Sequence, residues 1–283
     1  MSARIAVIGL VGKTIFMEVP RFHSGGETIH ATGLHEEWGG KGFNQAIAAA
    51  RQDAAVTFLG AASAEDAKEI SDFCRGEGVS AKMCVKRQPT ACAAILTDGT
   101  GETRVTVYPG AQLTAKDVDG FAGSIAMADF LLLNNEVPEE VNLAAVEIAR
   151  KYGVRIIFNP APARALPKKI LEAVSIFTPN EFEEKGLGDG LQGGSGVPPL
   201  QNYEVVTTLG AKGCRIRSTG EVIPAPAAKA VDSTGAGDTF NAVLAIRLAE
   251  GETLHDACVA ANTAAAQSVT ARYVLPSLPY RNS

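Results

Sequence analysis

Short apolar runs alternate along this chain with stretches patterned as helices, and this alternation restricts the fold more than any other feature. The runs that predict strands are Arg4–Ile8, Val56–Leu59, Phe130–Leu133, Val154–Phe158, Ser175–Thr178 and Glu204–Thr208. Helices are predicted over Phe43–Arg51, Ala64–Arg75, Pro138–Tyr152, with Pro138 as the first helical residue, and Ala242–Leu248. Because the strands are apolar on both sides, they favour a parallel sheet with helices on both faces. The predicted fold class is therefore α/β, with a mainly parallel central sheet between helical layers.

Two stretches, residues 14–38 and 90–108, break this rhythm. Both alternate polar and apolar residues and contain turn sequences, Ser24-Gly25-Gly26 and Asp98-Gly99. They predict antiparallel strands inserted into the α/β body as a small lid. A glycine- and proline-rich segment, Gly186–Pro199, predicts a flexible surface loop. Residues 1–283 are expected to form one domain with this inserted lid.

The charge balance and the apolar runs exclude several classes of protein. With 26 Lys and Arg against 31 Asp and Glu, the net charge is −5, which argues against nucleic-acid binding through bulk positive charge. No apolar run is long enough to span a membrane. The five cysteines are scattered without a CxxC pair, which favours reduced thiols and a cytoplasmic location.

The segment Gly9–Thr14 resembles a phosphate-binding P-loop because it ends in Gly-Lys-Thr. A P-loop needs four residues between its glycines so that the backbone can wrap around the phosphates. Here only Leu10 and Val11 separate Gly9 from Gly12, and no helical pattern follows. The segment is therefore not expected to bind nucleotide as a P-loop.

A stronger motif is Gly235-Ala236-Gly237-Asp238, which directly precedes a helical run. Small residues let a ligand approach the backbone, and the N–H groups at a helix start attract anions. An aspartate there would repel an anion, but it makes sense as a base that deprotonates a hydroxyl beside a phosphate. The alternative is that Asp238 only caps the helix.

A second glycine-rich turn, Gly39-Gly40-Lys41-Gly42, precedes the helix that contains Asn44. Its glycines permit backbone contact with a small polar ligand, and Lys41 and Asn44 supply hydrogen-bond donors. Such turns also occur for packing reasons, so the motif alone is weak evidence.

Together with Asn159–Ala163 and Thr178–Glu183, these two motifs resemble the ribokinase-type (PfkB) carbohydrate kinases in order and spacing. The similarity runs from about Ile5 to Pro279. The Asn-Pro-Ala-Pro-Ala sequence and the Gly110-Ala111-Gln112 turn are most similar to the ribokinase branch. The resemblance implies a ribokinase-like three-layer α/β/α sandwich with a β-sheet lid.

The resemblance also implies roles for individual residues. Asp238 would take the proton from a primary hydroxyl of the sugar, and Gly235, Ala236 and Gly237 would form the anion hole for the γ-phosphoryl group. Glu183 would contact Mg²⁺ through water. The implied ATP positions are Asn180, Thr208, Gly210, Ala211, Gly213, Gly237 and Asn262. The implied sugar positions are Gly12, Thr14, Gly40, Lys41, Asn44, Glu136 and Asp238.

Two of these assignments have plainer readings. Gly210 and Gly213 could simply form a hairpin turn before Cys214, which is compatible with lining a pocket. Glu136 could be a solvated residue before a helix. However, it follows an apolar predicted strand, where ligand groups of open α/β sheets tend to lie.

The chain departs from the family pattern at several positions. Gly12-Lys13-Thr14 stands where an Asn-x-Asp is usual, so a carboxylate acceptor for sugar hydroxyls is lost, at a cost of roughly 1.5–3 kcal/mol. Lys13 would instead suit an acidic or phosphorylated sugar. Asp53 and Ser63 stand where glycine or another small residue is usual. Tyr273 replaces a usual glycine, which puts K⁺ activation in question. The implied monovalent-cation loop comprises Asp232, Thr234, Ser268, Ala271, Tyr273 and Ser277.

The leading hypothesis is an ATP- and Mg²⁺-dependent kinase that phosphorylates a primary hydroxyl of a small sugar, ribose or a related pentose or hexose. The alternatives are a nucleoside or acidic-sugar kinase of the same fold and a non-catalytic sugar or nucleotide sensor. A homodimer formed through the lid strands is a further hypothesis.

Overall fold

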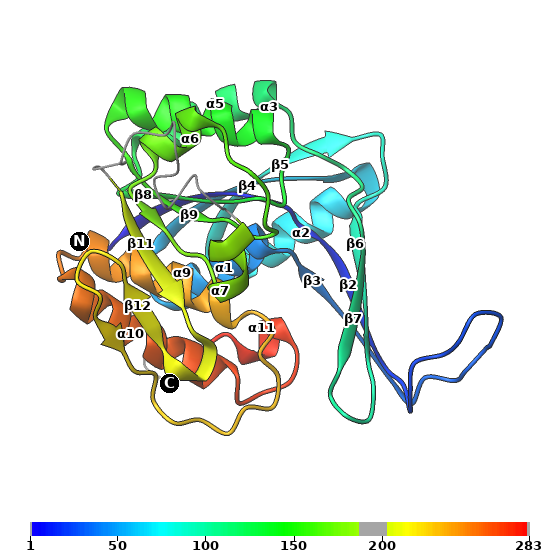
Figure 1. The fold of residues 1–283 in the computed structure, drawn as a ribbon. Coiled ribbons are helices and arrows are strands. Elements are labelled where there is room, and N and C mark those ends of the chain that lie inside the picture. The colour runs from blue at the N-terminus through cyan, green and yellow to red at the C-terminus, as the bar shows by residue number, and fades with distance from the viewer. Residues whose placement is uncertain (1, 187–202, 282–283) are drawn as a thin grey trace.

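The computed structural model describes residues 2–186 and 203–281, and its centre is a nine-stranded sheet (Figure 1). In spatial order the strands are β13 (Val222–Ile223), β12 (Cys214–Ile216), β11 (Glu204–Thr208), β10 (Ile176–Phe177), β9 (Arg155–Asn159), β8 (Phe130–Asn134), β1 (Arg4–Ile8), β4 (Ala55–Ser63) and β5 (Val79–Lys86). The strands from β11 to β5 run parallel, and β12 and β13 form an antiparallel edge. The mainly parallel sheet predicted from the sequence is confirmed. The predicted Gly186–Pro199 loop lies outside the described residues, apart from Gly186.

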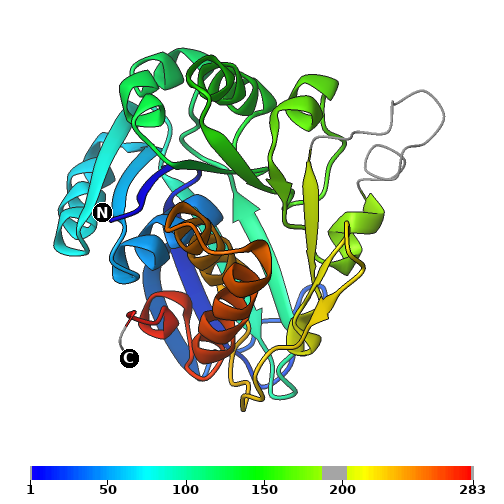
Figure 2. The ribbon, with the colours of Figure 1, turned by 90° about the vertical axis from the view of Figure 1, so that its left-hand side faces the viewer.

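Helices cover both faces of this sheet, as the two ribbon views show (Figures 1 and 2). One face carries α1 (Lys41–Arg51), α2 (Ala64–Gly76), α9 (Ala236–Ala249), α10 (Leu254–Ser268) and α11 (Val274–Ser277). The other carries α3 (Ala115–Asp119), α4 (Ala122–Ala126), α5 (Glu139–Tyr152) and α6 (Lys168–Ala173). Alternate residues of β1 point into the two cores, Ile5 and Val7 into one and Ala6 and Ile8 into the other. No helix in the described part of the chain is long and apolar enough to cross a membrane.

The helix boundaries follow local signals in the sequence, with two corrections. Helix α5 begins after Pro138, which is its N-cap and not its first residue, and it ends at Gly153 in the left-handed conformation. Helix α9 begins at Ala236, six residues before its predicted start at Ala242, because the Ala-Gly-Asp start carries little helical signal. Ser63, one of the departures from the family pattern, caps α2 by accepting a hydrogen bond from the backbone of Asp66.

Asp53, the other such departure, has a φ of +63°. A residue with a Cβ is strained in this left-handed region, whereas glycine is not. This conformation explains why glycine would be usual at that position.

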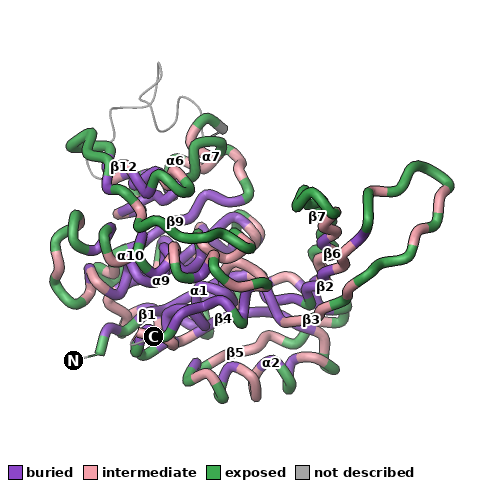
Figure 3. The backbone as a smooth tube through the Cα atoms, turned by 90° about the horizontal axis from the view of Figure 1, so that it is seen from below, coloured by how far each residue is buried: buried purple, intermediate pink, exposed green. Residues whose placement is uncertain are grey.

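The lid is a separate four-stranded sheet in the order β3 (Gly33–Gly39), β2 (Gly12–Glu18), β6 (Ala91–Thr97) and β7 (Thr103–Tyr108). It projects from the body, and the burial view shows its outer parts as intermediate or exposed (Figure 3). Each hairpin is antiparallel, as predicted, but β2 and β6 pair parallel. The prediction did not include this parallel pairing, which arises because β2 follows β1 and β6 follows β5. Both therefore leave the same edge of the central sheet in the same direction.

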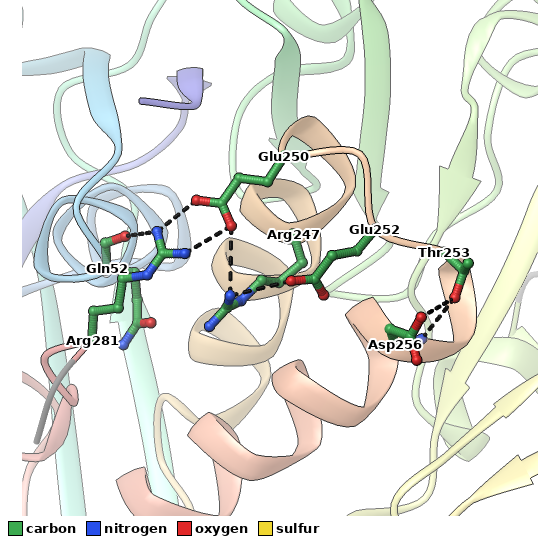
Figure 4. A network of polar contacts seen from close by, with 7 residues as sticks. All are labelled: Gln52, Arg247, Glu250, Glu252, Thr253, Asp256 and Arg281. Carbon is green, nitrogen blue, oxygen red and sulfur yellow. Dashed lines mark hydrogen bonds and ion pairs between the residues drawn. The ribbon is translucent and has the colours of Figure 1, made fainter. Parts of the chain in front are cut away.

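The C-terminal tail is fastened beside α1 and α9 (Figure 4). The two terminal nitrogens of Arg281 donate to the carboxylate of Glu250 at 2.6 and 2.8 Å, and one of them lies 3.5 Å from the Gln52 carbonyl. Glu250 also lies 3.5 Å from Arg247 of α9. This network holds Arg281 in place, so the segment that leads to it, residues 269–278, has a defined path past the lid.

Candidate functional site

The polar residues singled out in the sequence gather at the edge where the parallel strands end. Strands β1, β8, β9, β10 and β11 all run toward this edge, and helices α1 and α9 begin there. In open α/β sheets ligands bind outside the carboxyl ends of the strands, where the strand order reverses. Here the reversal lies at β1, which pairs with β4 on one side and β8 on the other. Two cavities open at this edge.

Asp238 is buried at the start of α9, as its third residue. Its carboxylate accepts hydrogen bonds from Asn44 Nδ2 at 3.0 Å and from Gln45 Nε2 at 3.2 Å, both on α1. The N-cap of α9 is Gly235, and no side chain caps this helix. The reading of Asp238 as a helix cap is therefore wrong. Sequence reasoning missed Gln45, because a glutamine within an alanine-rich helix carries no signal of function.

Burial makes the Asp238 carboxylate accept a proton more readily than an ordinary aspartate does. Burial raises the pKa of Asp238, and although Lys41, Asn44 and Gln45 lower it, the net shift is upward. Burial alone would lower the pKa of Lys41, but the negative charges of Asp238, Glu136 and Glu183 raise it. A half-buried ammonium thus faces a buried carboxylate whose basicity exceeds that of an ordinary aspartate.

The turn before α9 is shaped by glycine. Gly235 has a φ of +83°, and a Cβ placed on it would lie 2.6 Å from Val274 Cγ1. A Cβ on Gly237 would meet nothing within 4 Å and would enter open space beside the larger cavity. The first N–H groups of a helix have no acceptor within the helix and carry its positive dipole end. The start of α9 can therefore hold an anion next to Asp238.

The larger cavity, about 630 Å³, is lined by every position predicted for ATP. These are Asn180, Thr208, Gly210, Ala211, Gly213, Gly237 and Asn262. Residues that the sequence reasoning missed complete the wall, and they are small and apolar: Ala225, Pro226, Ala228, Ala230, Ala265, Ala266 and Val269. Such residues carry no distinctive pattern in a sequence.

Gly210 and Gly213 form the predicted turn and also line this cavity, so both readings of them hold. The turn Gly210–Lys212 joins β11 to β12. Gly213 has a φ of +96°, and an added Cβ would lie 2.0 Å from the Ile223 carbonyl oxygen. Asn262 donates from Nδ2 to that same carbonyl at 3.0 Å.

Asn180 and Glu183 have a local structural role beside the larger cavity. Asn180 Oδ1 accepts from the N–H groups of Phe182 and Glu183 at 2.9 and 2.8 Å, and Glu183 Oε2 accepts from Asn180 N at 2.9 Å. This reciprocal cap begins α7 (Glu181–Gly186). The three-residue spacing between Asn180 and Glu183 thus follows from helix capping, which fixes both side chains at the cavity wall.

The smaller cavity, about 280 Å³, is lined by every position predicted for the sugar, namely Gly12, Thr14, Gly40, Lys41, Asn44, Glu136 and Asp238. The lid contributes apolar residues that sequence reasoning missed: Phe16, Ala91, Ala93, Ile95, Val105 and Val107. Lys41, Thr234, Gly235 and Asp238 line both cavities. Asp238 therefore stands where the two spaces meet.

Glu136 is not the solvated residue of the plainer reading. Its Oε2 accepts a hydrogen bond from the backbone N–H of Lys41 at 2.7 Å. Burial raises the pKa of Glu136 to about 7, against the lowering effect of Lys41. At neutral pH this carboxyl group can therefore donate or accept a hydrogen bond in the smaller cavity.

Thr14 and Lys13 lie on opposite faces of the lid, because side chains alternate along a strand. Thr14 is buried and Lys13 is exposed, with its ammonium 5.8 Å from the ring centroid of Trp38. Both residues are among those that line the smaller cavity. Residues Gly12–Glu18 form a strand and not a helix, so the rejection of a P-loop is confirmed.

The residues of the implied cation loop are only partly brought together. Asp232 Oδ1 accepts from Thr234 N and Oγ1 at 2.9 and 2.7 Å, and its Oδ2 accepts from Tyr273 N at 3.1 Å. The hydroxyls of Ser268 and Ser277 instead donate to carbonyls one turn back, those of Ala265 and Val274. Ala271 lies in the segment that links α10 to Tyr273.

Comparison with known proteins gives consistent results over the full length. The family model described as "pfkB family carbohydrate kinase" matches residues 2–281. A ribokinase of Haemophilus influenzae is 31% identical, with 99% of this chain and 97% of that protein covered. The structure of Arabidopsis thaliana ribokinase complexed with ribose and ATP is 28% identical, with a TM-score of 0.85 over 100% of this chain and 97% of that one. A Thermotoga maritima ribokinase structure gives 30% identity and a TM-score of 0.87, over 99% and 97%.

Proposed function

The chain belongs to the pfkB family of carbohydrate kinases, and on this premise we propose that it transfers the γ-phosphoryl group of ATP to a primary hydroxyl of ribose or a related small sugar. It is a phosphotransferase with an alcohol group as acceptor, and its fold is that of the ribokinases. The observation that carries the proposal is the pair of unequal cavities that meet at Asp238. Residues 1–283 would act as one kinase domain with its lid.

Cavity size favours a small sugar over a nucleoside as the acceptor. The smaller cavity, about 280 Å³, lies just below the range of about 300–1,000 Å³ typical for drug-sized ligands. A pentose or hexose suits that space better than a sugar that carries a base. The larger cavity, about 630 Å³ with an apolar wall, suits a nucleotide.

The acidic-sugar alternative rests on a single exposed cation. This is Lys13, whose ammonium lies 5.8 Å from the ring centroid of Trp38. Thr14, the buried residue of the two, lines the smaller cavity and has a neutral hydroxyl. We therefore propose a neutral sugar as the acceptor, with Thr14, Asn44 and Glu136 holding its hydroxyls.

The acceptor hydroxyl would be activated by Asp238. As the hydroxyl oxygen attacks the γ-phosphorus in line, its proton would pass to the Asp238 carboxylate, and ADP would leave on the opposite side. A pKa raised by burial makes this carboxylate a stronger base. Asn44 and Gln45 hold its two oxygens in place, so that lone pairs on the carboxylate remain directed at the acceptor.

The negative charge on the transferring group would be stabilised by groups that are fixed before reaction. The backbone N–H groups of Gly235, Ala236 and Gly237 at the start of α9 would face it, and Lys41 lines both cavities beside it. Because the chain carries a net charge of −5, local groups must supply the attraction for ATP.

The resemblance also implies Mg²⁺, and the donors present are compatible with it. No cluster of three or more His, Cys, Asp or Glu side chains that could hold a metal occurs in residues 2–186 and 203–281. A magnesium ion would therefore take most of its ligands from phosphate oxygens and water, with Glu183 at the cavity wall contacting it through water. When bound with ATP it would neutralise charge on the phosphates.

Activation by K⁺ is the weaker part of the cofactor proposal. The carboxylate of Asp232 already accepts three hydrogen bonds from Thr234 and Tyr273. These protein groups therefore fix the loop without a bound cation. We expect turnover in potassium and in choline salts to agree within about twofold. A tenfold dependence on potassium would contradict this expectation.

Assembly and location remain proposals as well. A homodimer through the lid is supported by the exposed apolar residues Leu34, Val105, Val107 and Tyr108, and size-exclusion chromatography with light scattering would test it. A monomer would refute it. A cytoplasmic location is supported by five free cysteines, and cell fractionation would test it.

The main experiment is an ADP-release assay with a panel of pentoses, hexoses, nucleosides and sugar acids. We expect the highest kcat/KM with ribose or another neutral pentose or hexose. A higher kcat/KM with a nucleoside or a sugar acid would overturn the assignment of substrate. Absence of turnover on the whole panel, with sugar binding retained in calorimetry, would favour the non-catalytic sensor.

A further inference from the structure

The short segment 272–275 lies between the lid and the start of α9 and contacts both. On one side Val274 packs against Gly235, where an added Cβ would lie 2.6 Å from Val274 Cγ1. On the other side Glu37 of lid strand β3 accepts hydrogen bonds from the N–H groups of Val274 and Leu275 at 2.9 and 3.2 Å. The Glu37 side chain is only 5% exposed. One segment thus joins the lid to the turn that forms the anion hole.

Three aromatic rings reinforce this junction. Tyr273 stacks on His35 of β3, with ring centroids 3.8 Å apart and planes at 16°. It also meets Phe16 of β2 edge-on, at 5.2 Å and 63°. Phe16 lines the smaller cavity, and His35 Nε2 lies 3.2 Å from Glu37 Oε2. The ring of Tyr273 therefore contacts both strands of the first lid hairpin, one of them through a residue of the cavity wall.

The backbone of Tyr273 is fixed from the opposite side. Its N–H donates to Asp232 Oδ2 at 3.1 Å, and the other oxygen of Asp232 holds Thr234, the residue before Gly235. Tyr273 has a φ of +66°, a conformation that strains a residue with a Cβ and suits glycine. The contacts of the ring with His35 and Phe16 can offset this strain.

We propose that Tyr273 is a positioning residue that locks the lid to the anion-hole turn, so that the sugar cavity and the phosphate site keep one fixed relation. Tyr273 is not among the described residues that line either cavity. It acts through Phe16 on the sugar side and through Asp232 and Val274 on the phosphate side. The kinetic consequence rests on the proposed sugar-kinase function, whereas the structural one does not.

The test compares Tyr273→Gly with Tyr273→Phe. Glycine accepts the positive φ without strain and removes the ring, so a loss of function cannot be ascribed to a strained fold. With the best sugar of the panel, Tyr273→Gly should raise the KM for the sugar about tenfold, the upper end for a lost aromatic contact. The KM for ATP should stay within about twofold. Tyr273→Phe keeps both ring contacts and should match the parent protein.

A second measurement needs no substrate. Amide hydrogen exchange in β2 and β3 (residues 12–18 and 33–39) should become faster in Tyr273→Gly and stay at the parent rate in Tyr273→Phe. Unchanged exchange in Tyr273→Gly would overturn the lock. An equal rise in both KM values, or the same rise in sugar KM in Tyr273→Phe, would also overturn it. Hydrogen exchange is measured in the protein without substrate. It therefore tests the positioning role of Tyr273 even if the ADP-release assay refutes the sugar-kinase assignment.

Discussion

Replacing Asp238 with asparagine should remove the catalytic base while leaving the stability of the fold almost unchanged. The Asp238 carboxylate accepts one hydrogen bond from Asn44 Nδ2 and one from Gln45 Nε2. Asn44 Oδ1 is buried and has no hydrogen-bond partner in the described structure. In Asp238→Asn, the new Oδ1 can keep the bond from Gln45. A flip of the Asn44 amide then lets its free oxygen accept from the new Nδ2.

The magnitudes follow from this geometry. The count of hydrogen bonds is preserved and a buried charge is removed, so the free energy of unfolding should change by less than about 1 kcal/mol. The base is lost, so kcat should fall by about 10²–10⁴. ATP is held by the wall of the larger cavity and the start of α9, so its Kd should stay within about threefold. Asp238→Ala is the matched control, because it leaves both amide donors unpaired at about 1–3 kcal/mol each.

Three measurements check this prediction: ADP release with the preferred sugar, ATP binding by calorimetry, and thermal unfolding of both variants and the parent. Turnover of Asp238→Asn within tenfold of the parent would refute Asp238 as the base. Loss of ATP binding in Asp238→Asn would refute the view that the larger cavity and the start of α9 bind ATP independently of Asp238. Equal destabilisation of the two variants would refute the amide-flip argument.

Five further substitutions test the surroundings of the site and the stability of the fold. Glu136→Gln should raise the KM for the sugar by about 10- to 100-fold. The pKa of Glu136 is raised to about 7 in the folded state. The protonated carboxyl group therefore contributes stability below the unfolded-state pKa, near 4.3, and this contribution is lost as pH rises through 7. The Tm of Glu136→Gln relative to the parent should thus increase from pH 5 to pH 8. Thr14→Val should raise the sugar KM about threefold or more while Lys13→Ala leaves it unchanged; the reverse order would restore the acidic-sugar alternative. Arg51→Ala should lower the free energy of unfolding by about 3 kcal/mol. It removes the partner of the largely buried Glu77 carboxylate, 2.7 Å away, and of the backbone carbonyls of Leu275 and Leu278. Arg281→Ala, whose ion pair is more exposed, should cost under about 1 kcal/mol in the same denaturant titration.

Most elements of the body could be predicted because their signals are local. β1 and β11 have the predicted limits, and α5 ends at the expected Gly153. The failures occurred where local signals were weak or ambiguous. Strand β5 was not predicted because Val79–Lys86 has a mixed burial pattern at the sheet edge. Helix α10 was not predicted, although its cap, Thr253 with Asp256 three residues later, is a recognisable start signal.

The candidate site divides in the same way. Motif residues with unusual chemistry, such as Asp238 and Lys41, could be found from the sequence, and every position predicted for the sugar or ATP lines a cavity. Gln45 and the apolar lid residues could not be found. They belong to the site only because α1 packs against α9 and the lid folds over the sheet edge.

The sequence by itself determined the layered α/β fold and the inserted lid, and it supplied the candidate reactive residues, because strand and helix periodicity, glycine turns and motif spacing act over a few neighbouring positions. The tertiary structure decided which side chains meet. It paired Asp238 with an amide 194 residues away, buried Thr14 while leaving Lys13 exposed, and stacked Tyr273 on His35. Strand alternation requires Thr14 and Lys13 to face opposite ways, but only packing against the body selects the face that closes the cavity. Such contacts depend on where whole elements pack, which no local pattern specifies.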